Sequence, residues 1–146
     1  VDSSDSNYMN AMRFQMPSQS GIASSMFVYI ASPIGTSPNN QYQMAIYTNA
    51  SGSPGTLVAS TAIGTIIGNS WNTLLISATL NANATYWLVY NTNGTTSSQN
   101  NLRVDSGASN QMKWRAQTFG TWPSTFGAIA GSSNTTASIY VAYTVQ

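Results

Sequence analysis

Apolar and polar residues alternate along most of the chain in short runs. Methionine or phenylalanine occupies every second position of residues 12–16, and residues 26–30 and 42–47 show the same spacing. A period of two places the apolar side chains on one face of an extended strand. These runs predict half-buried β-strands, and further strands are expected at 56–60, 71–77, 85–91, 101–105, 111–117 and 137–145. In the last of these strands we expect four side chains to point inward: Ile139, Val141, Tyr143 and Val145.

Turn-forming residues separate these runs. Gly, Pro, Asn and Ser are concentrated at 32–40, 49–55, 91–101 and 119–127, where they favour changes of chain direction. No long window shows the period of an α-helix, and there is no repeat of fixed length. We therefore predict an all-β chain with a single domain over residues 1–146, a β-sandwich of two antiparallel sheets. A jelly roll is the expected strand order, and an immunoglobulin-type Greek key is the alternative.

Charged residues are scarce. Only 5% of the residues are charged and the net charge is +1, whereas 42% are hydrophobic, which is enough for an ordinary core. Four cations cannot follow a phosphate backbone, so we expect no nucleic-acid partner. No apolar run approaches the roughly 18 residues of a membrane helix, so we expect no membrane partner.

The composition favours a secreted, extracellular protein. More than a third of the residues are Ser, Thr or Asn, and there is no cysteine, which excludes disulfides and thiolate metal sites. Four Asn-x-Ser/Thr sequons are present, at Asn49, Asn83, Asn93 and Asn134. If the protein is secreted, we expect its signal sequence to have been removed before Val1.

The chain lacks the residues that most catalytic sites use. Glycoside hydrolysis ordinarily needs two carboxyl groups beside the bond, but there is no Glu, and Asp105 alone lies far from the amino-terminal region. There is no His, which leaves Lys113 as the one candidate base for a serine nucleophile. We therefore expect a non-catalytic protein without a cofactor. A structural calcium ion could use Asp2, Asp5 or Asp105 as oxygen ligands.

Three segments carry a resemblance to a known class of domain. These are "YQMAIYTNASGSPGTLVAST", "SWNTLLISATLNANATYWLVYN" and "TASIYVAYTV". Their strand rhythm and turn phrases resemble the jelly-roll carbohydrate-binding modules of secreted polysaccharide-degrading enzymes and surface proteins, over most of the chain from about residue 22 onward. The resemblance implies a jelly-roll β-sandwich that binds a polysaccharide.

The segment "QMKWRAQTFGTWPSTFG", residues 111–127, contains two of the four tryptophans. In a strand over 111–117, Trp114 shares a face with Met112, which predicts that it points toward the core. The other face then carries polar and charged side chains that could bind a ligand: Lys113, Arg115 and Gln117.

A neighbouring strand could add two more charges. In residues 101–105 we expect Leu102 and Val104 to point inward, and Asn101, Arg103 and Asp105 to point outward. If this strand pairs with 111–117, the charges form one patch. That patch could bind sugar hydroxyls or uronic carboxylates, or it could protect a sheet edge from aggregation, and both interpretations stay open.

Trp122 precedes Pro123 in a Gly-flanked loop, and a proline restricts the residue before it to extended geometry. A tryptophan held in this way could be a platform on which a sugar ring stacks, or a plug that closes one end of the sandwich. Three tyrosines on the nominally outward side of their strands are weaker stacking candidates: Tyr29, Tyr47 and Tyr140.

Two functions fit these observations. The first is a non-catalytic polysaccharide-binding module that stacks sugars on Trp122 and Trp114 and binds hydroxyls or carboxylates through the charged patch. The second is a structural subunit of an extracellular filament, sheath or adhesin. In that case residues 1–16 could self-associate by completing the sheet of a neighbouring copy.

Overall fold

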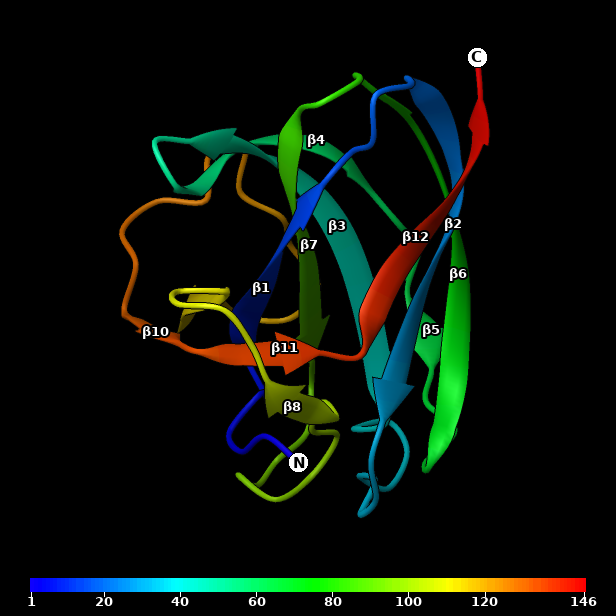
Figure 1. Ribbon diagram of the computed structural model, residues 1–146. Helices are drawn as coiled ribbons and strands as arrows, with labels where there is room; N and C mark the ends of the chain where they lie inside the picture. Colours follow the sequence, from blue (N-terminus) through cyan, green and yellow to red (C-terminus); the bar gives the residue numbers. More distant parts are fainter.

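The computed structural model describes residues 1–146 and contains strands but no helix (Figure 1). None of its elements is a helix that could cross a membrane. Each of the expected runs coincides at least in part with a strand, and the short β5, β10 and β11 are additional. The strands are β1 (Tyr8–Gln15), β2 (Gly21–Ile30), β3 (Gln41–Ala50), β4 (Ser53–Ser60), β5 (Gly64–Thr65), β6 (Ser70–Leu80), β7 (Thr85–Thr92), β8 (Val104–Ser106), β9 (Met112–Ala116), β10 (Gly131–Ser133), β11 (Thr135–Ala137) and β12 (Ile139–Val145).

The strands form two main antiparallel sheets that face each other. The larger sheet has the order β10-β9-β1-β7-β3-β4, with β5 paired to β3, and the smaller sheet has the order β12-β2-β6. In Figure 1 the smaller sheet stands on the right, and β8 and β11 form a separate pair below β1 and β7. The predicted β-sandwich of antiparallel sheets is confirmed, and its jelly-roll strand order stays a prediction.

The main core fills the space between the two sheets. It takes alternate residues from β1, β3 and β7 on one side and from β2, β6 and β12 on the other, as the period of two predicts. Tyr42, Met44 and Ile46 of β3 are buried, and so are Met26, Val28 and Ile30 of β2. This packing fixes which side chains of each sheet point away from the core.

The larger sheet has a second apolar cluster on its outward side. This second cluster consists of Met9, Ala11, Ala45, Tyr47, Trp87, Val89 and Phe126. The loop of residues 117–130 covers it, because the Tyr47 hydroxyl donates to the carbonyl oxygen of Pro123 at 2.7 Å and the Phe126 N–H donates to that of Gly55 at 2.8 Å. Tyr47 is therefore outward relative to the sandwich, as predicted, but it is fully buried and cannot stack a ligand.

The amino-terminal segment is fastened to the loop before β8. One oxygen of the buried Asp5 carboxyl accepts the Leu102 N–H at 2.7 Å, while the other oxygen has no partner. Burial, and next the negative charge of Asp2, raise the pKa of Asp5 well above its ordinary value. The folded chain therefore keeps a proton on this carboxyl to a higher pH than the unfolded chain does.

Two sequence predictions of side-chain direction are wrong. Asn101 is buried rather than outward, because its side chain accepts the Asp5 N–H and donates to the Ser97 carbonyl. Val145 is 49% exposed rather than inward. Tyr143, two residues earlier, still packs against the main core, whereas Val145 pairs with Gly21, the first residue of β2, and so lies at the end of the sheet.

Candidate functional site

The charged patch expected from the sequence does not form by strand pairing. The strand β8 pairs with β11, whereas β9 pairs with β1 and β10. Arg103 and Asp105 are exposed beside β11. Their segment does not pair with β9, the strand that carries Lys113 and Arg115. The alternation alone predicted each strand but could not predict its neighbour.

The cations of β9 contact the chain itself. Lys113 Nζ donates to the Gly52 carbonyl at 2.7 Å and to Ser53 Oγ at 2.8 Å, and it lies 5.7 Å from the centre of the Trp87 ring. A guanidinium nitrogen of Arg115 donates to the Phe126 carbonyl. These contacts hold the β3–β4 hairpin and the loop of residues 117–130 over the second cluster.

Trp114 is only partly buried, although it shares the face of the buried Met112 as predicted. Its indole lies against Gly131 of β10, where a side chain would collide with the ring. The exposed part lines a depression of about 390 Å³ with Asp2, Tyr8 and other polar residues. Gln117, just beyond β9, donates to Thr121 Oγ1 within the same loop at 3.0 Å.

Trp122 packs against the second cluster rather than standing free. Its ring lies 6.3 Å from that of Tyr47, at an angle of 57°, and its indole N–H is buried without a hydrogen-bond partner. Burial raises the pKa of Tyr47 to about 12, so its hydroxyl stays protonated and donates to Pro123. Of the two interpretations of Trp122, the geometry favours the plug over the platform.

Four aromatic side chains gather on the side of the smaller sheet that faces away from the core. Phe27 and Tyr140 lie opposite each other on β2 and β12 and stack, with ring centroids 4.6 Å apart. Tyr29 pairs with Trp71 of β6, and their rings meet edge to face at 5.7 Å. Trp71 also contacts Tyr140 at 5.2 Å although β2 lies between their strands. Both side chains therefore lean over β2 and join the four rings into one surface, the aromatic face.

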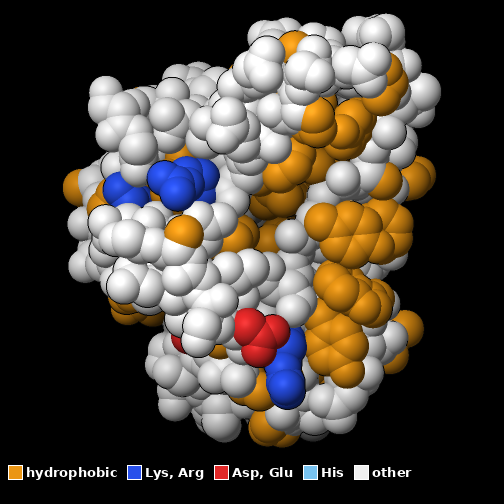
Figure 2. Space-filling model, viewed as in Figure 1, with side chains coloured by type: hydrophobic (Ala, Val, Ile, Leu, Met, Phe, Trp, Pro, Cys, Tyr) orange, Lys and Arg blue, Asp and Glu red, His pale blue; other side chains and the backbone are white.

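No charged residue lies on the three strands of the aromatic face, although Figure 2 shows an acidic and a basic side chain at the border of the apolar surface. The strands β2, β6 and β12 contain no Asp, Glu, Lys or Arg, and Ser and Thr share their outward positions with the rings. Trp71 and Tyr140 are about half exposed, and Leu75 and Ile22 extend the apolar surface. Figure 2 shows apolar side chains gathered on the right of the molecule, over β12 and β2. Such a surface can stack on the C–H face of a neutral ring while hydroxyls hydrogen-bond around it.

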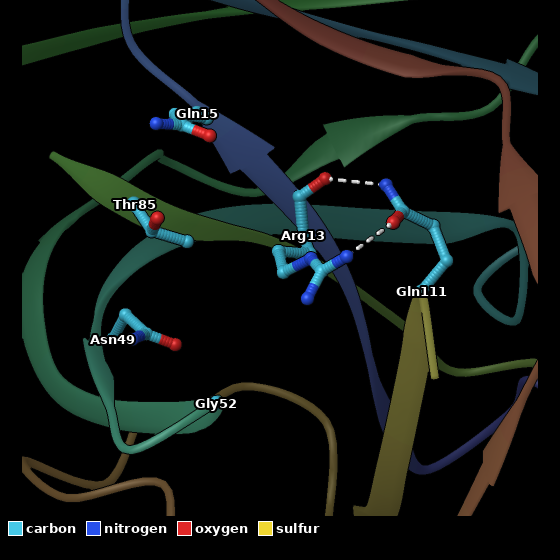
Figure 3. Close-up of a pocket in the computed structure, with 6 residues that line it drawn as sticks. All are labelled: Arg13, Gln15, Asn49, Gly52, Thr85 and Gln111. Atoms are coloured by element: carbon cyan, nitrogen blue, oxygen red, sulfur yellow. Dashed lines mark hydrogen bonds between the residues drawn. The ribbon is translucent and has the colours of Figure 1, made fainter. Parts of the chain in front are cut away.

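A cleft of about 400 Å³ opens on the larger sheet, on the side that faces away from the core. None of its lining residues is hydrophobic, and Figure 3 shows them arranged around the open space: Arg13, Gln15, Asn49, Gly52, Thr85 and Gln111. We refer to these residues as the polar cleft. Arg13 and Gln15 come from β1, Thr85 from β7 and Asn49 from β3, so three neighbouring strands supply one wall.

The hairpin between β3 and β4 brings Gly52 to this cleft. Ser51 and Gly52 have φ angles of 50° and 80°, the left-handed conformation that a tight two-residue hairpin requires. The Gly52 carbonyl then accepts the hydrogen bond from Lys113. Asn49 accepts the indole N–H of Trp87 at 3.0 Å, which orients its amide toward the cleft's rim.

The acidic residues do not form a metal-binding group. The structure contains no set of three or more His, Cys, Asp or Glu side chains that could surround an ion. Asp2 lies near Asp5, while Asp105 pairs with Thr136 across β8 and β11. A structural calcium ion therefore stays a prediction for single carboxylates supported by backbone oxygens.

No family model, curated protein or solved structure matches the chain. The functional interpretation rests on the surfaces that the fold presents, and the two most developed are the aromatic face and the polar cleft. The sequence alone did not indicate Trp71, Phe27 or Arg13 as functional residues. A signal for Trp71 was available, because it shares the phase of Thr73 and Ser77 in its strand, and that phase is the polar one.

Proposed function

We propose that this protein is a non-catalytic polysaccharide-binding module of the extracellular space, and that the aromatic face is its stacking surface. The observation that carries the proposal is the contact of Trp71 with Tyr140 across β2, which makes a continuous aromatic surface on an uncharged sheet. The resemblance in strand rhythm to jelly-roll carbohydrate-binding modules supports the same function. The ligand class is a neutral polysaccharide, since no cation or carboxylate lies on these strands.

The contribution of each exposed ring to ligand binding follows from the apolar surface that the ligand would cover. Trp71 is 47% exposed, and covering roughly 60 Å² of apolar surface contributes about 1.5 kcal/mol at 25 cal/mol per Å². Removing the ring should therefore weaken binding by about tenfold. Tyr140 is 46% exposed and should contribute a similar amount.

The test is binding to cellulose, chitin, xylan and mannan by affinity electrophoresis and pull-down. We expect at least one to bind, and expect Trp71→Ala and Tyr140→Ala to weaken that binding without lowering the melting temperature. Leu75→Ala is the matched control, because Leu75 is 80% exposed on the same face and has no ring. Unchanged binding in both ring variants would contradict the proposal.

The competing function, a structural subunit, makes a different prediction for the same variants. An assembly contact through this face would depend on Leu75 as well as on the rings, and light scattering would show association of the wild-type chain. In the structure β1 lies inside its own sheet, between β9 and β7, which leaves it paired on both sides. Turnover of a bound glycan that Asp105→Asn abolishes would contradict the non-catalytic part of the proposal.

A further inference from the structure

The polar cleft combines a positive charge with unused hydrogen-bonding groups. The Arg13 guanidinium makes one hydrogen bond within the chain, from Nη2 to Gln111 Oε1 at 3.3 Å. A guanidinium has five N–H donors, so most of them are free to bind a ligand. The side chain of Gln15, the Thr85 hydroxyl and the Asn49 Nδ2 group have no hydrogen-bond partner in the chain, and all three line the same cleft.

Gln111 holds the guanidinium in place. Its Nε2 donates to the Arg13 carbonyl at 2.9 Å while its Oε1 accepts from Nη2, so one amide fixes both ends of the arginine (Figure 3). The backbone N–H of Arg13 also donates to the Gln111 carbonyl at 3.0 Å. A donor fork that is fixed before a ligand arrives loses less conformational entropy on binding.

No carboxylate neutralises this charge. The chain has three acidic side chains, and none of them lines the cleft. A second cation, Lys113, lies at the cleft's edge, where its Nζ contacts Gly52. The cleft therefore has a positive potential and favours an anion.

The shape and lining select the kind of anion. The guanidinium fork matches the planar geometry of a carboxylate, which it can bind through two parallel hydrogen bonds. Amides and a hydroxyl around it suit a ligand rich in hydroxyls, and the absence of any hydrophobic lining residue disfavours an apolar acid. The volume of about 400 Å³ lies in the range of small-molecule sites.

We propose that the polar cleft binds a carboxylate-bearing sugar, a uronic acid unit, with Arg13 on the carboxylate and Gln15, Asn49 and Thr85 on the hydroxyls. This site lies on the outward side of the larger sheet, whereas the aromatic face lies on the outward side of the smaller sheet. The two surfaces thus take different ligands, one acidic and one neutral. The proposal does not depend on the aromatic face, and each surface can be tested without the other.

Isothermal titration with trigalacturonate, triglucuronate and trimannuronate tests the site. The methyl ester of each trisaccharide keeps the rings and removes the charge, and the free monosaccharide acids distinguish a small soluble ligand from a polymer unit. We expect at least one acid to bind and its ester to bind roughly 10- to 100-fold more weakly, as when hydrogen bonds to a charged group are lost. Binding should weaken as salt rises.

Arg13→Gln should weaken binding of the acid by the same roughly 10- to 100-fold and leave any binding of the ester unchanged. Arg13→Lys keeps the charge but loses the planar guanidinium, so its affinity for the acid should lie between those of the wild type and Arg13→Gln. It also provides a second variant if Arg13→Gln does not fold. Arg103→Gln is the matched control, because it removes the same charge from an exposed position outside the cleft. Trp71→Ala should bind the acid as the wild type does.

Three results would overturn the proposal. One is the absence of binding of every uronate to the wild-type chain at millimolar concentration. Another is equal affinity for an acid and its methyl ester. The third is an equal loss of affinity in Arg13→Gln and Arg103→Gln, which would show that net charge rather than the cleft attracts the ligand.

Discussion

Substitutions at Trp122 separate packing from hydrogen bonding in the second cluster. Truncation of a fully buried aromatic residue to Ala costs about 3–5 kcal/mol. Trp122 is only partly buried, so we expect Trp122→Ala to lower the free energy of unfolding by about 2–4 kcal/mol. The ring contacts Tyr47 and helps the loop of residues 117–130 to cover the larger sheet.

Trp122→Phe should behave differently. The indole N–H is buried without a partner, and leaving a buried donor unsatisfied costs about 1–3 kcal/mol. Phenylalanine removes this donor but also loses apolar area worth about one or two methylene groups, at roughly 0.8 kcal/mol each. The two effects oppose each other, so we expect the free energy of unfolding of Trp122→Phe to lie within about 1 kcal/mol of the wild type.

Urea unfolding followed by far-ultraviolet circular dichroism measures both variants, since this signal comes mainly from the backbone and persists when the tryptophan is removed. Glycan binding by the folded variants is the second measurement, and we expect no change. If Trp122→Phe is as unstable as Trp122→Ala, the indole N–H has a partner and contributes to stability. If Trp122→Ala is as stable as the wild type but loses glycan binding, Trp122 is an exposed platform and the plug interpretation is wrong.

Two further predictions concern the fold that supports these surfaces. The raised pKa of Asp5 means that the folded chain keeps a proton that the unfolded chain releases above pH 3.8. The free energy of unfolding should therefore fall as pH rises from 3.8 to the higher pKa that Asp5 has in the folded chain. Asp5→Asn keeps an acceptor for the Leu102 N–H and should be more stable than the wild type at pH 7, with a smaller pH dependence in melting experiments; an equal pH dependence in both proteins would contradict this. Phe126→Ala should cost about 3–5 kcal/mol in urea unfolding, because Phe126 is fully buried beneath the loop that it anchors, and a loss below about 1 kcal/mol would show that the second cluster collapses around the gap.

The positions of the strands could be predicted because burial on one face imposes a period of two on the sequence. Residues 42–47 illustrate this, since Tyr42, Met44 and Ile46 all point into the core between the sheets. The same alternation also predicted that Tyr47 lies on the opposite face. It could not predict that a loop seventy residues later covers that face, because the path of residues 117–130 is fixed by tertiary contacts such as the one between Tyr47 and Pro123.

The candidate site was harder to predict for a related reason. Strand pairing joins β8 to β11 and β9 to β1, and alternation contains no information about such neighbours. Trp122 was a predicted stacking residue because it precedes a proline, whereas Trp71 was not predicted although the polar phase of its strand places it outward. The polar cleft combines β1, β3 and β7 with residues 52 and 111, and no local pattern could bring these together.

The central place of β1 in the larger sheet also has a consequence for how the chain acquires its structure. β1 pairs with β7 and β9, and β2 pairs with β6 and β12, so the first two strands find their partners in segments that are synthesised much later. Loop closure over such separations is entropically costly, and folds dominated by these contacts form in roughly milliseconds to seconds. The larger sheet is complete only when residues 131–133 are available, and the smaller sheet only when residues 139–145 are, because β10 and β12 supply their last strands. Folding should therefore be a late and cooperative event, and until it occurs the apolar strand β2 needs protection from aggregation.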